Sequence, residues 1–302
     1  VEVLLLDICP KELNENELKQ NLSLESKKVK NRIVNEMFQK CIKSRPSPIY
    51  NKKFLDRIKL GNFEDDINKI NEVDWIIEVV VEKLDIKKSV FDLVEKHRRT
   101  GTIITSNTSG IPIKLMNEGR SDDFKECFAI THFFNPPRYL NLFEVVPGPN
   151  CKKEILDFLL NYGEKFLGKT SVLAKDTPAF IGNRIGIFGI MSLFHQIKNG
   201  KYSVEEVDKL TGPAIGRPKS ATFRTADIAG LDTMCHVANG VYEKCKDDES
   251  REVFKLPDFL QKMLDNNMLG SKTGKGFYQK IKEDNGKSKI LALDLKTFKY
   301  NE

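Results

Sequence analysis

The sequence predicts an α/β fold, with a doubly wound parallel sheet in a first domain and a second, all-helical domain after it. Two observations lead to this prediction. Short apolar runs of the kind that form buried parallel strands alternate with stretches of helical spacing up to about residue 175, and strand-like runs almost vanish afterwards. A chain of 302 residues, 40% of them hydrophobic, is also long enough to bury the cores of two domains.

The strands expected in the first domain are short apolar runs bounded by polar or turn-forming residues. Strand followed by helix repeats along this part of the chain, which predicts βαβ units and a parallel sheet. A charged helical insertion follows the first strand and closes at the turn-forming Arg45-Pro46-Ser47-Pro48. The expected strands cover residues 1–7, 74–81, 101–106, 128–131 and 170–174, and the expected helical stretches cover 11–43, 86–94 and 154–166.

The pattern changes at Asp176-Thr177-Pro178. Thr177 can cap a helix whose first residue is Pro178. This helix is apolar nearly all round, so we predict that it is buried between domains or between subunits. After Tyr278 the chain becomes polar and rich in lysine, with no clear contribution to a core. We therefore expect two domains followed by a tail or linker, over residues 1–175, 176–280 and 281–302.

The composition limits the classes of partner. The net charge of +6, from 49 Lys and Arg against 43 Asp and Glu, is small and spread along the chain, which argues against a nucleic-acid binder and weakly favours phosphorylated ligands. The six cysteines form no C-x-x-C pair, so we expect neither a metal site nor disulfides. No apolar run reaches about 18 residues and no secretory signal opens the chain, so we expect no membrane span and a cytoplasmic location.

Asp7 ends the first visible strand. A carboxylate at this place can accept hydrogen bonds from the ribose hydroxyls of an adenine dinucleotide, and a plain turn acid is the alternative. In a Rossmann-like sheet, the run over residues 1–7 would be the second strand, with the first strand missing. The G-x-G-x-x-G turn that would cradle the pyrophosphate is not in the chain. From the usual size of the βαβ unit we expect about 25 further residues upstream of Val1.

Polar residues follow two of the later strands, at the edge where ligands bind in open α/β sheets. Ser106-Asn107-Thr108-Ser109 offers short side chains suited to a nicotinamide ribose or a substrate oxygen, and a polar turn is the alternative. Glu82 and Lys87 flank the start of the helix after the 74–81 strand, at the same edge. Most such charges are merely solvated, so both interpretations of this pair stay open.

His132 follows an apolar run, and Glu144 lies within the next one, on an expected return strand. If the two strands pair, the carboxylate accepts a hydrogen bond from one ring nitrogen, fixes the tautomer and raises the basicity of the other nitrogen. A structural histidine is the alternative. Asn135 can bond an amide or a hydroxyl, and Pro136-Pro137 stiffens the turn between the strands. Together these residues favour a base that takes the proton of a carbon-bound hydroxyl opposite a nicotinamide.

Two polar residues of the second domain are further candidates. Asn183 lies among apolar side chains and needs a partner, either backbone across the domain interface or the His132 site. Lys272 opens a glycine-containing stretch that lacks the G-x-x-x-x-G-K-S/T order of a phosphate loop. The remaining histidines have no carboxylate partner at a suitable spacing, and we expect them to be structural or solvated. They are His97, His195 and His236.

Four motifs give the chain a resemblance to a known family. Their order, spacing and context resemble those of the L-3-hydroxyacyl-CoA dehydrogenase family, from Val1 to about Tyr278. The stretch from Gly216 to Thr225 departs from the Gly-Pro-Phe pattern of short members. It looks like bacterial β-oxidation proteins, in which this dehydrogenase is fused to an enoyl-CoA hydratase-like domain. The motifs are Ser106-Asn107-Thr108-Ser109, His132-Phe133-Phe134-Asn135-Pro136 with Glu144, Asp176-Thr177-Pro178 with Asn183-Arg184, and Gly230-Leu231-Asp232-Thr233.

The resemblance implies the oxidation of (S)-3-hydroxyacyl-CoA to 3-ketoacyl-CoA in fatty-acid β-oxidation, with NAD as hydride acceptor. His132 would be the base, Glu144 would orient it, and Ser106 and Asn183 would hold the reacting oxygen. The 1–175 domain would bind NAD, and the helical domain would cover the acyl-CoA and form a homodimer interface. The residues implied to contact the cofactor are Asp7, Glu82, Lys87, Ser106, Asn135 and Lys272.

Other interpretations of the chain stay open. The same hydride chemistry could act on a small free hydroxy acid, although the Phe133-Phe134 pair favours an apolar acyl chain. The chain could also be a non-catalytic folding and dimerisation unit of a larger multifunctional protein. We expect the residues beyond Tyr278 to lead into further domains, and we expect weak NAD affinity of the chain without the glycine turn.

Overall fold

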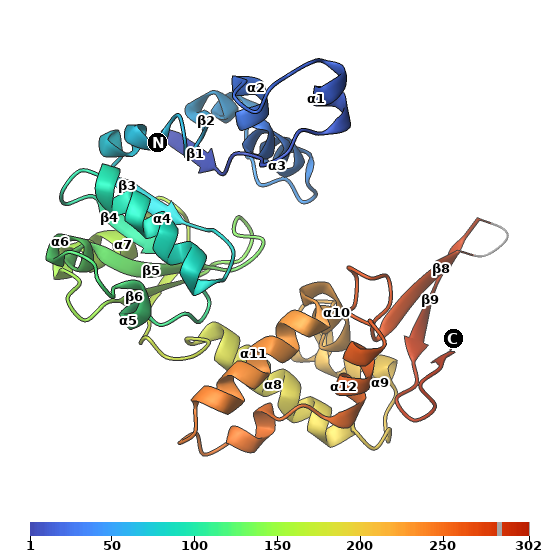
Figure 1. Ribbon diagram of the computed structural model, residues 1–302. Helices are drawn as coiled ribbons and strands as arrows, with labels where there is room; N and C mark the ends of the chain where they lie inside the picture. The colour runs from blue at the N-terminus through green and yellow to red at the C-terminus, as the bar shows by residue number, and fades with distance from the viewer. Residues whose placement is uncertain (283–285, 302) are drawn as a thin grey trace. The chain divides into compact units, whose positions relative to one another are not determined.

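The computed structural model describes residues 1–282 and 286–301 (Figure 1). The chain divides into two compact units, Val1–Asp176 and Thr177–Glu302. The first unit contains a parallel two-stranded sheet and a mixed five-stranded sheet with helices, and the second unit is mainly helical. The predicted fold class is confirmed.

The first unit opens with a two-stranded parallel sheet and the predicted helical insertion. Strand β1 pairs with β2 from Val3 against Ile58 to Asp7 against Asn62. The insertion between these strands is helical, as predicted, and its first helix begins with a capping box in which Asn14 and Glu17 bond each other's backbone. The elements are β1 (Val3–Asp7), α1 (Glu15–Lys19), α2 (Lys27–Lys30), α3 (Arg32–Lys43), η1 (Lys52–Arg57) and β2 (Ile58–Asn62).

A five-stranded sheet follows, in the order β3-β4-β5-β6-β7. Strands β3, β4 and β5 are parallel to one another. Strand β6 runs antiparallel to β5, as expected of a return strand, and β7 is parallel to β6. The strands are β3 (Trp75–Glu78), β4 (Ile103–Ser106), β5 (Phe128–Phe133), β6 (Leu142–Pro147) and β7 (Thr170–Leu173), and the helical segments are η2 (Ile67–Glu72), α4 (Leu84–His97), α5 (Ile113–Met116), α6 (Asp122–Glu126) and α7 (Lys153–Lys165).

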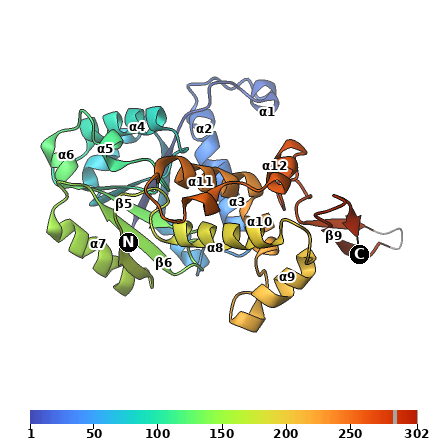
Figure 2. The ribbon, with the colours of Figure 1, turned by 90° about the horizontal axis from the view of Figure 1, so that it is seen from below.

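Helices cover both faces of this sheet (Figure 2). Side chains along β5 alternate between the faces. Phe128 packs on Phe91 of α4 and Phe124 of α6, with ring centroids 5.4 and 5.3 Å away. Ala129, one residue later, joins the buried cluster that includes Leu159 of α7. The near-continuous burial of β5 therefore follows from helices on both sides, as expected of a parallel sheet.

The strands of the first unit form two sheets, where a single one was predicted. Within residues 1–282 and 286–301, no strand pairs with the second edge of β1 or of β3. The apolar side chains near these edges are correspondingly open, with Val3 43%, Leu5 39% and Ile77 42% exposed. Strands whose composition suits full burial therefore lie half-exposed at the places where the sheets end.

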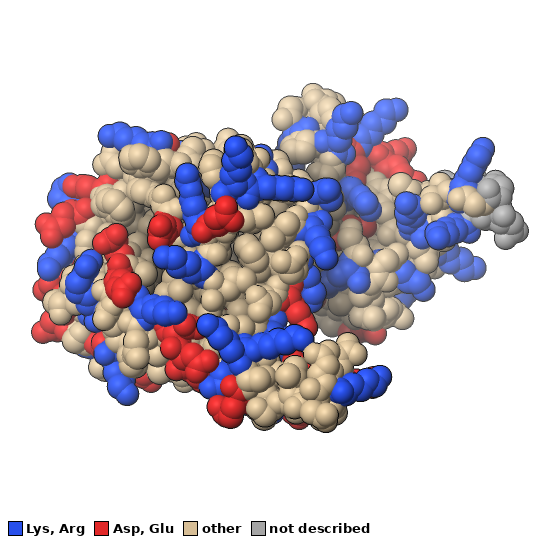
Figure 3. All heavy atoms as spheres, turned by 90° about the horizontal axis from the view of Figure 1, so that it is seen from above, with Lys and Arg blue, Asp and Glu red and all other residues tan. Residues whose placement is uncertain are grey.

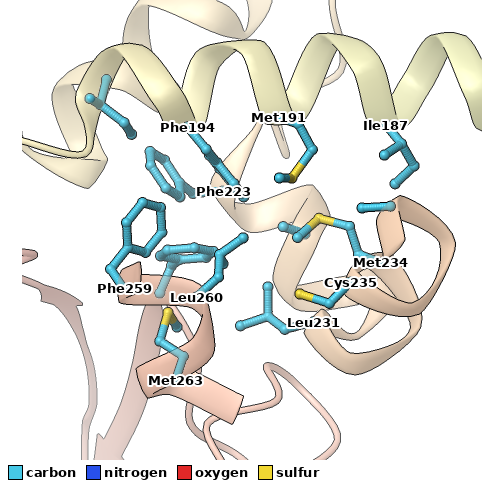
Figure 4. Packing of buried hydrophobic residues seen from close by; sticks show 14 of the residues in the cluster. Ile187, Met191, Phe194, Phe223, Leu231, Met234, Cys235, Phe259, Leu260 and Met263 are labelled. Atoms are coloured by element: carbon cyan, nitrogen blue, oxygen red, sulfur yellow. The ribbon is translucent and has the colours of Figure 1, made fainter. Parts of the chain in front are cut away.

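The second unit is built around aromatic and sulfur-containing side chains (Figure 4). Phe194 stacks on Phe223 at 5.2 Å between centroids and also contacts Phe259 and Phe277. The helical segments are α8 (Gly182–Ile197), α9 (Val204–Thr211), η3 (Pro213–Ile215), α10 (Phe223–Ala229), α11 (Leu231–Lys244), η4 (Arg251–Phe254) and α12 (Asp258–Asp265).

The predicted start of the first helix in this unit is wrong. Helix α8 begins at Gly182, four positions after Pro178. Ala179 and Phe180 have φ values of 63° and 44°, in the left-handed region, so the backbone turns before the helix begins. Asn183 consequently lies in the first turn of α8.

The prediction of a tail or linker over 281–302 is corrected by a three-stranded antiparallel sheet that packs on the helices of the second domain. Ala292 and Leu293 of its middle strand are 5% and 2% exposed and belong to the helical core. The prediction failed because lysines alternate with the apolar residues and gave the segment a polar appearance. Residues 283–285 and 302 of the predicted tail lie outside the described part. The strands are β8 (Tyr278–Lys282), β9 (Ser288–Leu293) and β10 (Tyr300–Asn301).

Two carboxylates join this sheet to the helices. Asp227 of α10 is 1% exposed and accepts the backbone N–H groups of Phe277 and Tyr278, both at 2.8 Å. Asp208 of α9 accepts the backbone N–H of Phe223 at 2.7 Å and the hydroxyl of Tyr278 at 2.9 Å. Burial raises the pKa of Asp227 to about 6, despite the two N–H donors.

Glycine at position 163 lets α7 approach the sheet. A Cβ there would lie 2.7 Å from Cδ1 of Phe143 and closer still to Oγ of Ser171. We expect Gly163→Ala to lower the free energy of unfolding by about 1–3 kcal/mol, because the contact forces backbone or side-chain shifts. In thermal unfolding, Gly240→Ala in α11 is the matched control, since its Cβ would meet nothing within 4 Å. The control should be neutral or stabilising by up to about 1 kcal/mol. Equal effects of the two variants would contradict this packing.

The raised pKa of Asp227 predicts a pH-dependent stability. Below about pH 4 this group is protonated in the folded and the unfolded states. As the pH rises from about 4 to about 6, the unfolded state gives up this proton while the buried group of the folded state keeps it, so the free energy of unfolding falls and then levels off above about pH 6. About two pKa units correspond to a loss of about 3 kcal/mol. Denaturant unfolding of the wild type and of Asp227→Asn should show this difference between pH 4 and 7, and parallel curves would refute it.

Candidate active site

The first part of the site lies at the last residues of β3 and β4. Glu78 and Ser106 are register partners at the carboxyl ends of these parallel strands. The Ser106 hydroxyl donates to Oε2 of Glu78 at 2.5 Å, and the two residues are 0% and 3% exposed, serine first. The sequence reasoning missed Glu78. Its signal was present, because it is the one charge between Trp75 and Val81, and an acid within a buried strand needs a partner.

Lys87 supplies that partner from the first turns of α4. Its ammonium donates to Oε1 and Oε2 of Glu78 at 2.9 and 3.0 Å and lies 3.2 Å from Oε2 of Glu82. Lys87 is only 1% exposed, while the Glu82 side chain is 45% exposed. The structure therefore brings Lys87 and Glu82 together with Ser106, with Glu78 between them. Of this set, Glu82 is the member that water reaches.

The loop after β4 connects this cluster to the histidine. Glu82 accepts the Thr108 hydroxyl and, at 3.0 Å, the backbone N–H of Ser109. The Ser109 hydroxyl lies 3.0 Å from Nε2 of His132. In addition, the Asn107 side chain accepts the backbone N–H of Phe133 at 2.9 Å, which ties the loop to the end of β5. One polar network thus extends from Lys87 to His132.

His132 and Glu144 form the second half of the site. They are register partners in the antiparallel β5–β6 pair, and Nδ1 of His132 lies 2.6 Å from Oε2 of Glu144. Glu144 is 0% exposed and His132 3% exposed. A carboxylate at this distance accepts from Nδ1–H, which makes Nε2 the acceptor nitrogen of the ring, with the Ser109 hydroxyl as its donor in this structure. The predicted contact between these two side chains is confirmed.

The other candidate residues lie elsewhere in the fold. Asp7 ends β1 in the two-stranded sheet, where its Oδ1 accepts the backbone N–H of Ile8 at 2.8 Å. Asn135 lies exposed in the turn between β5 and β6. Asn183 and Lys272 belong to the second unit, where Asn183 lies half-buried in α8 and Lys272 forms an ion pair with Asp232. The structure thus brings together the candidates on β4, α4, β5 and β6.

Three further observations concern the surface, the helices and metal binding. Acidic and basic side chains are interspersed over much of the face drawn in Figure 3, in keeping with the small net charge. In the part of the chain that the structure describes, no helix has the length and apolar character needed to cross a membrane. No set of three or more His, Cys, Asp or Glu side chains is grouped there in a way that could hold a metal ion.

Comparison with known proteins identifies relatives over most of the chain. A protein of Bacillus subtilis named "Probable 3-hydroxyacyl-CoA dehydrogenase" is 50% identical over 100% of this chain and 38% of its own length. A Rickettsia prowazekii protein that bears the name of a fatty acid oxidation complex trifunctional enzyme is 30% identical over 99% of this chain and 40% of its own. The chain therefore spans less than half the length of these two relatives.

A solved structure shows the same architecture. The (S)-3-hydroxybutyryl-CoA dehydrogenase PaaH1 from Ralstonia eutropha is 25% identical, with a TM-score of 0.69 over 91% of this chain and 89% of that one. Residues 1–177 match the family model described as 3-hydroxyacyl-CoA dehydrogenase, NAD binding domain, and residues 180–280 match the model of its C-terminal domain. The chain belongs to the 3-hydroxyacyl-CoA dehydrogenase family, as its motifs predicted.

Proposed function

We propose that this chain is a dehydrogenase module that oxidises (S)-3-hydroxyacyl-CoA to 3-ketoacyl-CoA, with NAD as hydride acceptor, in fatty-acid β-oxidation. The observation that carries the proposal is the buried contact between His132 and Glu144, at 2.6 Å. The names of the relatives supply the substrate class. Like the trifunctional relative, the whole protein would combine this step with others of the same sequence of reactions.

In this reaction His132 is the general base. Nε2 takes the proton of the 3-hydroxyl while hydride leaves C3, and the imidazolium that forms is stabilised by the Glu144 carboxylate at Nδ1. Glu144 does not need to take the proton, because holding the ring and its tautomer is sufficient. Ser106 and Asn183 would hold the reacting oxygen, so that the hydroxyl proton points at Nε2.

The residues present fit an adenine dinucleotide. Asp7 offers a carboxylate at the carboxyl end of a parallel strand, where ribose hydroxyls are bound in such folds. Beyond β3, Val79 and Val81 are 66% and 59% exposed next to the polar Glu82, a combination suited to a flat ring with a polar edge. When bound, NAD supplies the acceptor for the hydride. The residues that would hold it are Asp7, Glu82, Lys87, Ser106, Asn135 and Lys272.

An aromatic side chain next to His132 supports an acyl substrate. Phe134 lies against the His132 ring, with centroids 4.6 Å apart, and gives the site an apolar wall suited to an acyl chain.

The second unit would cover the acyl-CoA and provide a homodimer interface. A cytoplasmic location accords with six cysteines that are all unpaired thiols in the structure.

Removal of the base tests the mechanism. In the protein encoded by the complete reading frame, we expect His132→Ala and Glu144→Gln to lower the rate of acetoacetyl-CoA-dependent NADH oxidation by about 10²–10⁴-fold. His97→Ala, at the end of α4, is the matched control and should keep its activity. Activity of His132→Ala within about tenfold of the wild type would eliminate the assigned role.

A substrate panel tests the acyl-CoA assignment. With 3-hydroxyacyl-CoA thioesters and small free 3-hydroxy acids offered at equal concentration, we expect kcat/KM to favour the thioesters. The physical reason is the apolar surface of Phe134, which lies against the His132 ring and which a short free acid cannot cover. Initial rates of NADH formation give the comparison. Equal or higher kcat/KM for the free acids would favour a hydroxy-acid dehydrogenase instead.

A further inference from the structure

We propose that Glu78 is a positioning residue for the dehydrogenation, that it acts through Ser106, and that Lys87 serves as its counter-ion. The inference rests on the proposed function and adds a residue to it. Glu78 does not reach the solvent and has no part in binding or in proton transfer as described above. Its effect on the reaction would come from where it holds the Ser106 hydroxyl.

The contacts of Glu78 are made entirely by donors. Oε1 accepts the Lys87 ammonium at 2.9 Å and the backbone N–H of Val80 at 2.7 Å. Oε2 accepts Lys87 at 3.0 Å and the Ser106 hydroxyl at 2.5 Å. An ammonium and an amide have no lone pair to offer in return, so this arrangement suits an ionised carboxylate. The single proton of Ser106 is therefore directed at Glu78 in the absence of ligand.

This arrangement prepares Ser106 for a developing negative charge. When His132 removes the substrate proton, the reacting oxygen gains charge, and rotation about the Cβ–Oγ bond of Ser106 redirects its proton from Glu78 to that oxygen. Glu78 keeps three donor contacts after the rotation, two from Lys87 and one from Val80. Donation to Glu78 therefore fixes the position of Oγ before the reaction, and the Thr108 N–H, 3.3 Å from Oγ, still holds it when the proton turns to the substrate.

Lys87 makes the arrangement possible. An isolated carboxylate at 3% exposure would be strongly disfavoured, and its charge would oppose the charge that develops on the substrate oxygen. The buried ammonium of Lys87 compensates for the cost of burying the carboxylate. It also offsets the repulsion between the carboxylate and the charge on the substrate oxygen. The contact of Lys87 with Glu82 extends the network to the loop that carries Ser109, next to His132. The serine and histidine sides of the site are thus held by one set of contacts.

The test is a double-mutant cycle in the protein encoded by the complete reading frame. We expect Glu78→Gln and Ser106→Ala each to lower kcat by about 10–10²-fold, with KM for the acyl-CoA changed less than about threefold. We expect the double variant to be no slower than the slower single variant, because Glu78 acts only through Ser106. A merely structural role of Glu78 would give multiplied effects, and that outcome, or a kcat of Glu78→Gln within about twofold of the wild type, would overturn the proposal.

Two controls keep the outcome interpretable. Glu95→Gln removes a carboxylate on the same helix as Lys87, one that accepts the Ser121 N–H at 2.8 Å, and it should leave kcat unchanged. If Glu78→Gln does not fold, Glu78→Asp, which keeps the charge opposite Lys87 but is one methylene too short to hold Ser106, enters the cycle in its place. A wild type without acyl-CoA-dependent activity would mean that the proposed function fails. An active, His132-dependent enzyme with multiplied Glu78 and Ser106 effects would mean that only this inference fails.

Discussion

The antiparallel pairing of β5 with β6 is the constraint on which the site depends. Side chains on paired strands alternate between faces, so a shift of the register by one residue would place Glu144 on the opposite face from His132. The observed register puts the two directly across from each other. Helices on both faces bury these strands, which removes water from the contact between the two side chains. The contact between His132 and Glu144, its burial and the basicity of the imidazole therefore all depend on the register of β5 against β6.

The second constraint is the cost of burying charge. Glu78, Lys87 and Glu144 are each at most 3% exposed, and every isolated charge at such depth costs several kcal/mol. The fold limits this cost by giving each group partners of opposite charge or hydrogen-bond donors within about 3 Å. Stability alone would favour apolar side chains at these positions. The polar network therefore supports the proposed dehydrogenation, which needs polar groups at these positions.

The sequence was informative where structure follows from local patterns. The apolar runs predicted β1 and β3 to β7, whereas β2 and the strands of the second unit were missed. The short separation between His132 and Glu144 predicted their contact, because strands that follow each other in sequence usually pair. The burial of Lys87 was not predictable, since periodicity does not show which charged side chain of a helix faces a carboxylate on a strand. Glu78 was overlooked although its signal, an acid within a buried strand, was present in the sequence. The start of α8 was missed because the positive φ angles of Ala179 and Phe180 leave no signature in the sequence.

The sheet of the second unit extends beyond the residues that match the family model of the C-terminal domain. Similarity to the C-terminal domain model ends at residue 280, within β8, whereas Leu293 of β9 fills the helical core and bonds the carbonyl of Phe277 at 2.8 Å. A polypeptide cut where the similarity stops would keep the helices but expose the apolar surface that β9 covers. It would also separate β8 from its pairing strand. The family model of the C-terminal domain is thus shorter than the unit that packs together in this chain.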